Sequence, residues 1–158
     1  MDTITTRQTV QTRQHYGCFA AGWPLLLPPN LDCALCYQPD VHPQPHRSAV
    51  FPGLIEHGGW PLPLFDLQSL AVPRPLSGDS APEPTWVIVW GRGRDALSLK
   101  LDSLPVAVSD LQPARFPQTL PSVLRSCVRS SFRDAQQHWL AIDLVKLGQQ
   151  LSRLASSP

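Results

Sequence analysis

Proline content and a shortage of helix-forming residues constrain this chain most. It carries 18 prolines in 158 residues, which is about twice the average share of about 5%. Its only glutamates are Glu56 and Glu83, and its only lysines are Lys100 and Lys146. Glu and Lys normally cover helix surfaces, and proline is excluded from helix interiors. The sequence therefore predicts an all-β protein of many short strands with minor α content.

Charge and hydropathy restrict the function classes. The net charge is +1, which argues against nucleic acid as a partner because phosphate binding needs many cationic contacts. Only 16% of the residues are charged, so we expect exposed apolar patches that meet partner proteins. The sequence has no apolar run long enough to cross a bilayer and begins with a polar stretch, so we expect no membrane insertion and no secretory signal. Four cysteines in such a chain indicate reduced thiols in the cytoplasm.

Apolar periodicity places the strands. A glycine turn at Gly22 separates 16–20 from 23–27, and residues 31–37 alternate with period 2. Segments 50–57 and 60–65 flank Gly58 and Gly59, a pair typical of a tight hairpin turn. Further strands are expected at 85–90, 96–101, 105–111, 123–130 and 138–142. The leucines at 144, 147, 151 and 154 predict a C-terminal amphipathic helix capped by Asp143.

One pattern occurs twice, and it indicates two similar small barrels. An apolar strand end is followed by Asp, Leu, two residues and Leu at Asp66 and again at Asp143, with a weaker copy at Asp102. Residues 1–14 have no apolar period and are expected to form a flexible N-terminal arm, and 72–84 a proline-rich surface loop.

Candidate chemistry is sparse. Two thiols and two imidazoles could bind a tetrahedral zinc ion, and the set would be Cys33, Cys36, His42 and His46. Their weakness as a site is that Cys33 and Cys36 are an odd number apart, so a regular strand would point them to opposite faces. Asp66, Asp102 and Asp143 follow strand ends and read as caps rather than as paired acid–base carboxylates. We therefore expect no catalytic residues, no bound metal and no cofactor.

Residues 53–67, GLIEHGGWPLPLFDL, resemble the CheW-like domain family of chemosensory coupling proteins. That family's stretch reads roughly Gly-Val-Ile-Asn-x-Arg-Gly-x-x-x-Pro-Val-x-Asp-Leu. The positions that match it without a gap are Gly53, Ile55, Gly59, Pro63, Asp66 and Leu67. Residues 19–28, 99–104 and 138–147 resemble the family's opening hairpin, its Val-Val-Asp-x-Val segment and its closing strand and helix, in that order.

The resemblance implies a fold and a function. The fold is two intertwined five-stranded SH3-like β-barrels plus a C-terminal helix, which would form a CheW-like domain over residues 15–156. The function is a non-catalytic adaptor that couples the cytoplasmic tip of chemoreceptors to the regulatory domain of a CheA-type histidine kinase, with other CheW-like proteins as further partners. The expected contact residues surround the first barrel's hairpin: Leu54, Ile55, Glu56, Gly58, Trp60 and Leu62.

Three positions depart from the family. Gly58 stands where the family has arginine, Glu56 where it has asparagine, and Ser98 where it prefers glycine. These departures favour an adaptor of an accessory system, such as one for type IV pilus (twitching) motility, over the main adaptor of a flagellar array. Two other interpretations stay open: the small zinc-binding β module described above, and a generic SH3-like domain that binds proline-rich or other peptides.

Overall fold

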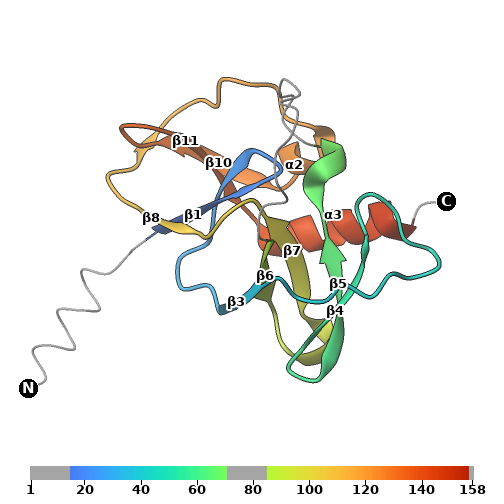
Figure 1. The fold of residues 1–158 in the computed structure, drawn as a ribbon. Helices are drawn as coiled ribbons and strands as arrows, with labels where there is room; N and C mark the ends of the chain where they lie inside the picture. Colours follow the sequence, from blue (N-terminus) through green and yellow to red (C-terminus); the bar gives the residue numbers. More distant parts are fainter. Residues whose placement is uncertain (1–14, 71–84, 157–158) are drawn as a thin grey trace, which may run out of the picture.

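The computed structural model describes residues 15–70 and 85–156, and these form two curled β-sheets with a C-terminal helix beside them (Figure 1). The expected arm at 1–14 and the expected loop at 72–84 lie outside the described residues. The all-β prediction with minor helix is confirmed. Among the described residues, no helix is long and apolar enough to span a membrane.

One sheet has six strands in the order β8-β1-β2-β11-β10-β9. All neighbours in it are antiparallel except β2 and β11, where Leu25 pairs with Leu140 in parallel. Its sixth strand, β9, has only two residues. The strands are β1 (His15–Ala20), β2 (Trp23–Leu26), β8 (Val106–Val108), β9 (Gln112–Pro113), β10 (Val128–Arg133) and β11 (His138–Ile142).

The second sheet has five strands in the order β3-β6-β7-β5-β4. It repeats the plan of the first, because β5 and β7 are its parallel pair and the rest are antiparallel. The strands are β3 (Cys33–Tyr37), β4 (Gly53–His57), β5 (Trp60–Phe65), β6 (Trp86–Trp90) and β7 (Leu97–Leu101).

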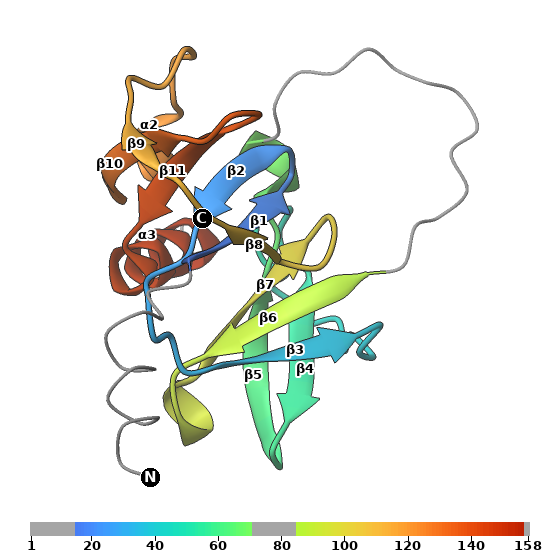
Figure 2. The same ribbon diagram turned by 90° about the vertical axis from the view of Figure 1, so that its left-hand side faces the viewer.

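The chain path intertwines the two sheets. It begins in the six-stranded sheet with β1 and β2, builds the whole five-stranded sheet, and returns to finish the first sheet with β8 to β11. Figure 2 shows the two sheets as separate bodies with α3 (Leu144–Ser156) alongside the six-stranded one. This arrangement confirms the predicted pair of intertwined β units with a C-terminal helix.

The core has three parts, which explains how two small sheets form one unit. The five-stranded sheet encloses a cluster around Ile55 and Leu62, and the six-stranded sheet one around Leu26 and Trp139. A larger shared cluster lies between them and collects apolar side chains from both sheets and from α3. It includes Trp23, Leu25, Phe65, Ile88, Leu99, Leu140, Leu147 and Leu151. Burial of this shared cluster joins the two units through the hydrophobic effect.

Two aspartates begin helical turns as the sequence predicts. The Asp66 carboxylate accepts from the Gln68 amide at 2.9 Å, at the start of the 3-10 helix η1 (Leu67–Leu70). The Asp143 carboxylate accepts from the Lys146 amide at 3.1 Å, at the start of α3. That amide, and then Arg129, hold the pKa of Asp143 below its ordinary value. Both are helix N-caps after a strand that has a parallel partner.

Asp102 acts differently from the other two. Its carboxylate accepts from the amides of Ala21 at 3.0 Å and Gly22 at 2.8 Å. These amides belong to the turn between β1 and β2, so Asp102 links the end of β7 to the other sheet. The weaker third copy of the pattern is therefore a link between sheets, and the structure corrects the prediction of a cap.

Residues 123–130 were expected to form one strand, and the structure corrects this. A short helix, α2 (Ser122–Arg125), comes first, and β10 begins only at Val128. A short apolar run such as this one does not by itself distinguish a strand from a helical turn. Leu124 and Cys127 are three residues apart, which is a helical spacing, and both are buried.

Prolines in β5 are accommodated by the register of its hairpin. Leu54 of β4 pairs with Pro63, yet its N–H and C=O bond outward, to the backbone of His42. Leu54 and Pro63 are therefore a pair that exchanges no backbone hydrogen bonds, so the missing N–H of Pro63 removes no hydrogen bond from the β4–β5 ladder. On the other side, the buried Ser98 hydroxyl donates to the Pro63 carbonyl at 2.7 Å and links β7 to β5.

Candidate functional site

The β4–β5 hairpin contains all the contact residues expected from the sequence. Its two-residue turn is Gly58–Gly59, with φ of +59° and +82°. Two consecutive positive φ values are what a tight hairpin turn of this length needs, and glycine adopts them without strain. Within residues 15–70 and 85–156, no atom lies within 4 Å of the position that a side chain would take at either glycine, so this part of the chain leaves the hairpin tip open.

Burial divides the six expected contact residues into two groups. Ile55 and Leu62 face each other across the hairpin and are fully buried in the core of the five-stranded sheet, where no partner can reach them. Leu54 is half-buried, while Glu56, Gly58 and Trp60 are exposed. Trp60 keeps 46% of its surface exposed. The surface available to a partner is therefore the hairpin tip and its tryptophan.

A pocket of about 310 Å³ lies beside this tip, and we call it the Trp60 pocket. The 3-10 helix η2 (Gly93–Asp95) supplies one wall, and a Cβ added to Gly93 would lie 3.7 Å from the indole Nε1 of Trp60. No pattern in the sequence predicts that residues 89–96 lie next to the hairpin. The lining residues are Asp32, Cys33, Ala34, His57, Gly58, Trp60, Val89, Gly91, Gly93 and Ala96.

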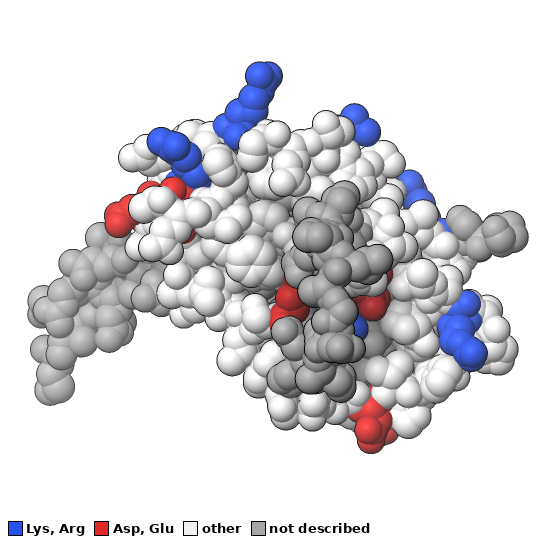
Figure 3. Space-filling model, turned by 45° about the horizontal axis from the view of Figure 1, so that its top comes forward, with Lys and Arg blue, Asp and Glu red and all other residues white. Residues whose placement is uncertain are grey.

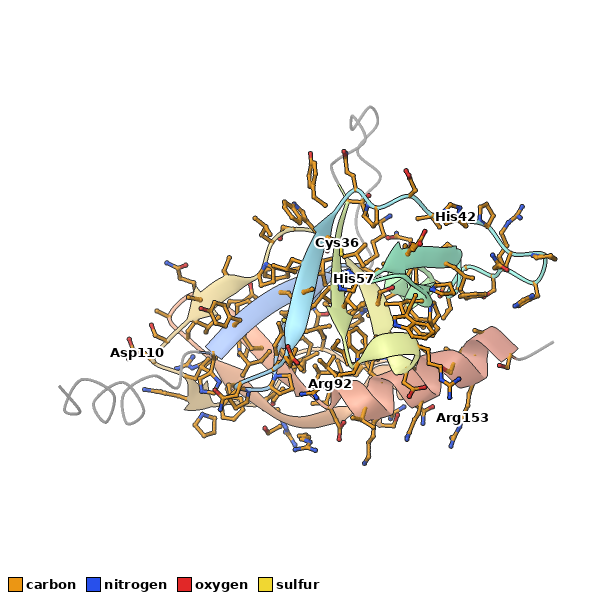
Figure 4. The ribbon with its side chains drawn as sticks, turned by 90° about the horizontal axis from the view of Figure 1, so that it is seen from below. Cys36, His42, His57, Arg92, Asp110 and Arg153 are labelled. Carbon is orange, nitrogen blue, oxygen red and sulfur yellow. The ribbon has the colours of Figure 1, made fainter. Side chains whose placement is uncertain are left out.

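The seam of the five-stranded sheet runs next to this pocket. β3 and β4 are the two edge strands, and Cys36 of β3 lies 3.6 Å (Sγ to Nδ1) from His57 of β4 (Figure 4). Burial raises the pKa of the Cys36 thiol above its ordinary value, so the thiol is protonated at neutral pH. The contact brings the two edges together, as expected for a sheet that curls toward a barrel.

A second, apolar groove of about 430 Å³ lies between the two units. Tyr16 and Leu35 form exposed parts of its walls, with 46% and 43% of their surface accessible. On the same side of β3, Tyr37 continues the apolar surface and packs on Trp86, with 4.7 Å between ring centroids. The described residues that line the groove are all uncharged: Tyr16, Leu27, Pro28, Asn30, Leu31, Cys33, Leu35 and Pro105.

Sequence reasoning missed this groove. The alternation over 31–37 placed Leu35 and Tyr37 on one side of a strand, which is correct, but did not reveal that this side faces outward. Charge is sparse elsewhere too. On the face shown in Figure 3, most described residues are uncharged, and the Lys and Arg side chains stand apart from one another.

The zinc site proposed from the sequence is not formed. Cys33 lies on the more exposed side of β3 and Cys36 on the opposite side, as the odd spacing predicts for a regular strand. The backbone of His42 pairs with Leu54, and the His46 ring stacks on Phe51 at 5.7 Å. Within residues 15–70 and 85–156, no three His, Cys, Asp or Glu side chains are grouped so as to hold a metal ion.

Comparisons with known proteins bear on the fold. No protein-family model matches the chain, and no curated protein matches it. Among solved structures, the chain is similar to the scaffolding protein TtCheW from Thermoanaerobacter tengcongensis, with a TM-score of 0.58 at 14% sequence identity. The match covers 83% of this chain and 88% of that one. At this identity the likeness establishes the architecture, and the chain therefore has the CheW-like fold of two SH3-like β units.

Proposed function

We propose that this protein is a non-catalytic chemosensory adaptor, which couples chemoreceptors to a CheA-type histidine kinase. The observation that carries the proposal is a CheW-like fold with two candidate docking surfaces, which adjoin at Cys33. One is the Trp60 hairpin tip and the other is the apolar groove of Tyr16 and Leu35. An adaptor needs two such surfaces because it must hold two partners at once.

The three candidate carboxylates fit a structural role better than a catalytic one. Asp66 and Asp143 accept from amides of their own helical turns, and Asp102 accepts from the β1–β2 turn. A general base instead has a lone pair directed at substrate. The surface of the chain suits association, because Trp60, Tyr16 and Tyr37 are exposed and Trp and Tyr are enriched among the residues that contribute most to binding at interfaces.

We infer that each of the two surfaces binds a different partner. We assign the Trp60 hairpin to the regulatory domain of the kinase, and the uncharged groove to the cytoplasmic tip of a receptor. Other CheW-like proteins, which present similar surfaces, would compete for either. The adaptor would then work in the cytoplasm, where these partners lie.

The hairpin tip supports an accessory pathway, such as type IV pilus motility, over the main flagellar array. Gly58 occupies the position of the family's arginine, and none of the residues that the structure describes places an atom within 4 Å of where that side chain would begin. Glu56 adds a negative charge where the family has a neutral amide. A kinase contact built on the arginine would be lost, so the cognate kinase should differ from that of a flagellar system.

Reconstitution tests this function. The chain is mixed with a receptor-tip fragment and the kinase regulatory domain of the same organism's chemosensory systems, and the complexes are sized by chromatography with light scattering. We expect receptor and kinase fragments to elute together only when the chain is present, and the pilus-system kinase to be preferred.

Surface variants make the test specific. Trp60→Ala should release the kinase fragment and Leu35→Ser the receptor fragment. The matched control is Val145→Ser, since Val145 is 67% exposed on α3 and lines neither surface. Separate elution of the fragments in the presence of the chain would overturn the proposal, as would equal losses in the Val145 variant.

A further inference from the structure

The Trp60 indole has an unused hydrogen-bond donor. Trp23 and Trp139 donate their indole N–H groups to the Leu70 carbonyl and to Asp134. For Trp60, no acceptor is found among the described residues, although its Nε1 lies close to Gly93 at the wall of the pocket. A half-exposed indole presents both an apolar face and a polar N–H to a ligand. Trp60 is therefore poised to take an acceptor from another molecule.

Asp32 supplies negative charge to the Trp60 pocket. Of the described residues that line the pocket, Asp32 is the one that is charged at neutral pH whatever its surroundings. The guanidinium of Arg92 lies 4.0 Å from it, and the side chains of Asp32 and Arg92 are 85% and 91% exposed. Such a pair contributes little, because both ions stay hydrated and screened. The Asp32 carboxylate therefore remains available to another cation.

The walls of the pocket allow close approach. Gly58 and Gly93 line it, both with positive φ, and neither carries a side chain that would hold a ligand backbone away. An extended peptide can thus lie against the tip with its carbonyl groups near the indole. The volume of about 310 Å³ holds one long side chain rather than a whole helix.

We propose that the Trp60 pocket binds an extended segment of a partner protein through a lysine or arginine side chain. The cation lies over the indole face and pairs with Asp32, while the indole N–H donates to a peptide carbonyl of the segment. This inference rests on the proposed adaptor function only in assigning the segment to an adaptor's partner. It adds the chemistry by which that partner is recognised.

Charge complementarity selects this occupant over the others. A carboxylate would meet Asp32 and be repelled, and a purely apolar side chain would cover Asp32 without pairing it. A cation gains from both the carboxylate and the tryptophan, whose face attracts positive charge. Among ring systems the indole gives the strongest such attraction, so Trp60 is suited to the role.

Indole N–H resonances provide a direct test. The ¹⁵N-labelled chain is titrated with the peptide acetyl-Gly-Pro-Arg-Pro-Gly-amide, and with the same peptide carrying glutamine in place of arginine. We expect the Trp60 indole signal, assigned with Trp60→Phe, to shift and saturate. The signals of Trp23 and Trp139, whose N–H groups are already bonded, should stay in place. The glutamine peptide should bind about fivefold more weakly, the size of an exposed cation–π contact.

Two variants separate the contribution of the Asp32 charge to peptide binding from that of the Trp60 indole. Asp32→Asn should weaken binding of the arginine peptide and leave the glutamine peptide unchanged, whereas Arg92→Gln should strengthen binding by removing a competing cation. Asp40→Asn, an exposed aspartate outside the pocket, is the matched control.

The inference is overturned if the Trp60 signal does not shift, if both peptides bind equally, or if Asp32→Asn has no effect. Kinase binding by the chain together with any of these results would leave the adaptor function standing. Peptide binding by a chain that forms no complex with kinase or receptor fragments would contradict the adaptor function and support the peptide-binding role of the Trp60 pocket.

Discussion

The Asp102 carboxylate accepts a hydrogen bond from the Gly22 amide at 2.8 Å. This bond joins the end of β7 in one sheet to the β1–β2 turn of the other, where no strand pairing connects the two sheets. Replacing Asp102 by alanine removes the acceptor for Gly22 and for Ala21. We expect the free energy of unfolding to fall by about 2 kcal/mol, since bonds to a charged acceptor are among the stronger ones. Urea denaturation followed by circular dichroism measures it. Asp40→Ala, at an exposed site, should change stability by less than about 0.5 kcal/mol; equal effects would contradict the link.

Gly17 of β1 leaves room for the indole of Trp139, which would collide with any added Cβ. The ring cannot retreat, because it is buried and its Nε1 donates to Asp134 at 3.1 Å. We expect Gly17→Ala to lower the melting temperature and to cost about 1–3 kcal/mol, as overpacking does.

Gly148 offers a contrast within the same experiment. A Cβ there would meet only the end of the Leu97 side chain, which can rotate away. Alanine also favours the helix by about 1 kcal/mol over glycine. Gly148→Ala should therefore be nearly neutral, and a loss as large as that of Gly17→Ala would show that the helix α3 packs more rigidly than inferred.

Thiol reactivity should follow the environment of each cysteine. Partial burial, and then the Asp32 carboxylate, raise the pKa of the Cys33 thiol, so at pH 7.5 it should react with iodoacetamide more slowly than an unhindered cysteine peptide. Asp32→Asn should speed the reaction about twofold, because a screened charge contributes a few tenths of a kcal/mol. Peptide mass spectrometry follows the modification. A Cys33 rate that is indifferent to Asp32 would place that carboxylate further away.

Alkaline pH should destabilise the fold through Cys18. Burial, with a smaller contribution from Asp102, raises the pKa of this thiol to about 12. A folded pKa above the unfolded one means that the stability it contributes is complete below about pH 9 and is lost as the pH rises toward 12. Between pH 8 and pH 10 the free energy of unfolding should fall by about 1 kcal/mol more in the native chain than in Cys18→Ala. Parallel losses in both proteins would exclude Cys18 as the cause.

Local residue patterns in the sequence predicted most of the fold, but they did not predict contacts between residues far apart in the chain. The glycine pair at 58–59, the proline-poor apolar run at 85–90 and the Asp66 and Asp143 caps each follow from neighbouring residues alone. Period 2 also separated the two sides of the hairpin strands, but it does not say which side faces the core. For that reason the buried Ile55 was grouped with the exposed Glu56.

The candidate site was only partly visible in the sequence. Trp60 was among the contact residues expected from the family resemblance, and its side chain is exposed. Its pocket, however, depends on Asp32 and Gly93, which lie about 30 residues away on either side and meet it only because the sheet curls. The link from Asp102 to the β1–β2 turn spans 80 residues. Such contacts follow from topology, which single-sequence patterns leave undetermined.

The decisive measurement for the adaptor function is isothermal titration calorimetry with the kinase regulatory domain. We expect a saturable heat of binding with one chain per domain, which is lost in Trp60→Ala and kept in Val145→Ser. Absence of heat and of a complex with the regulatory domains of every chemosensory kinase of the organism would contradict it.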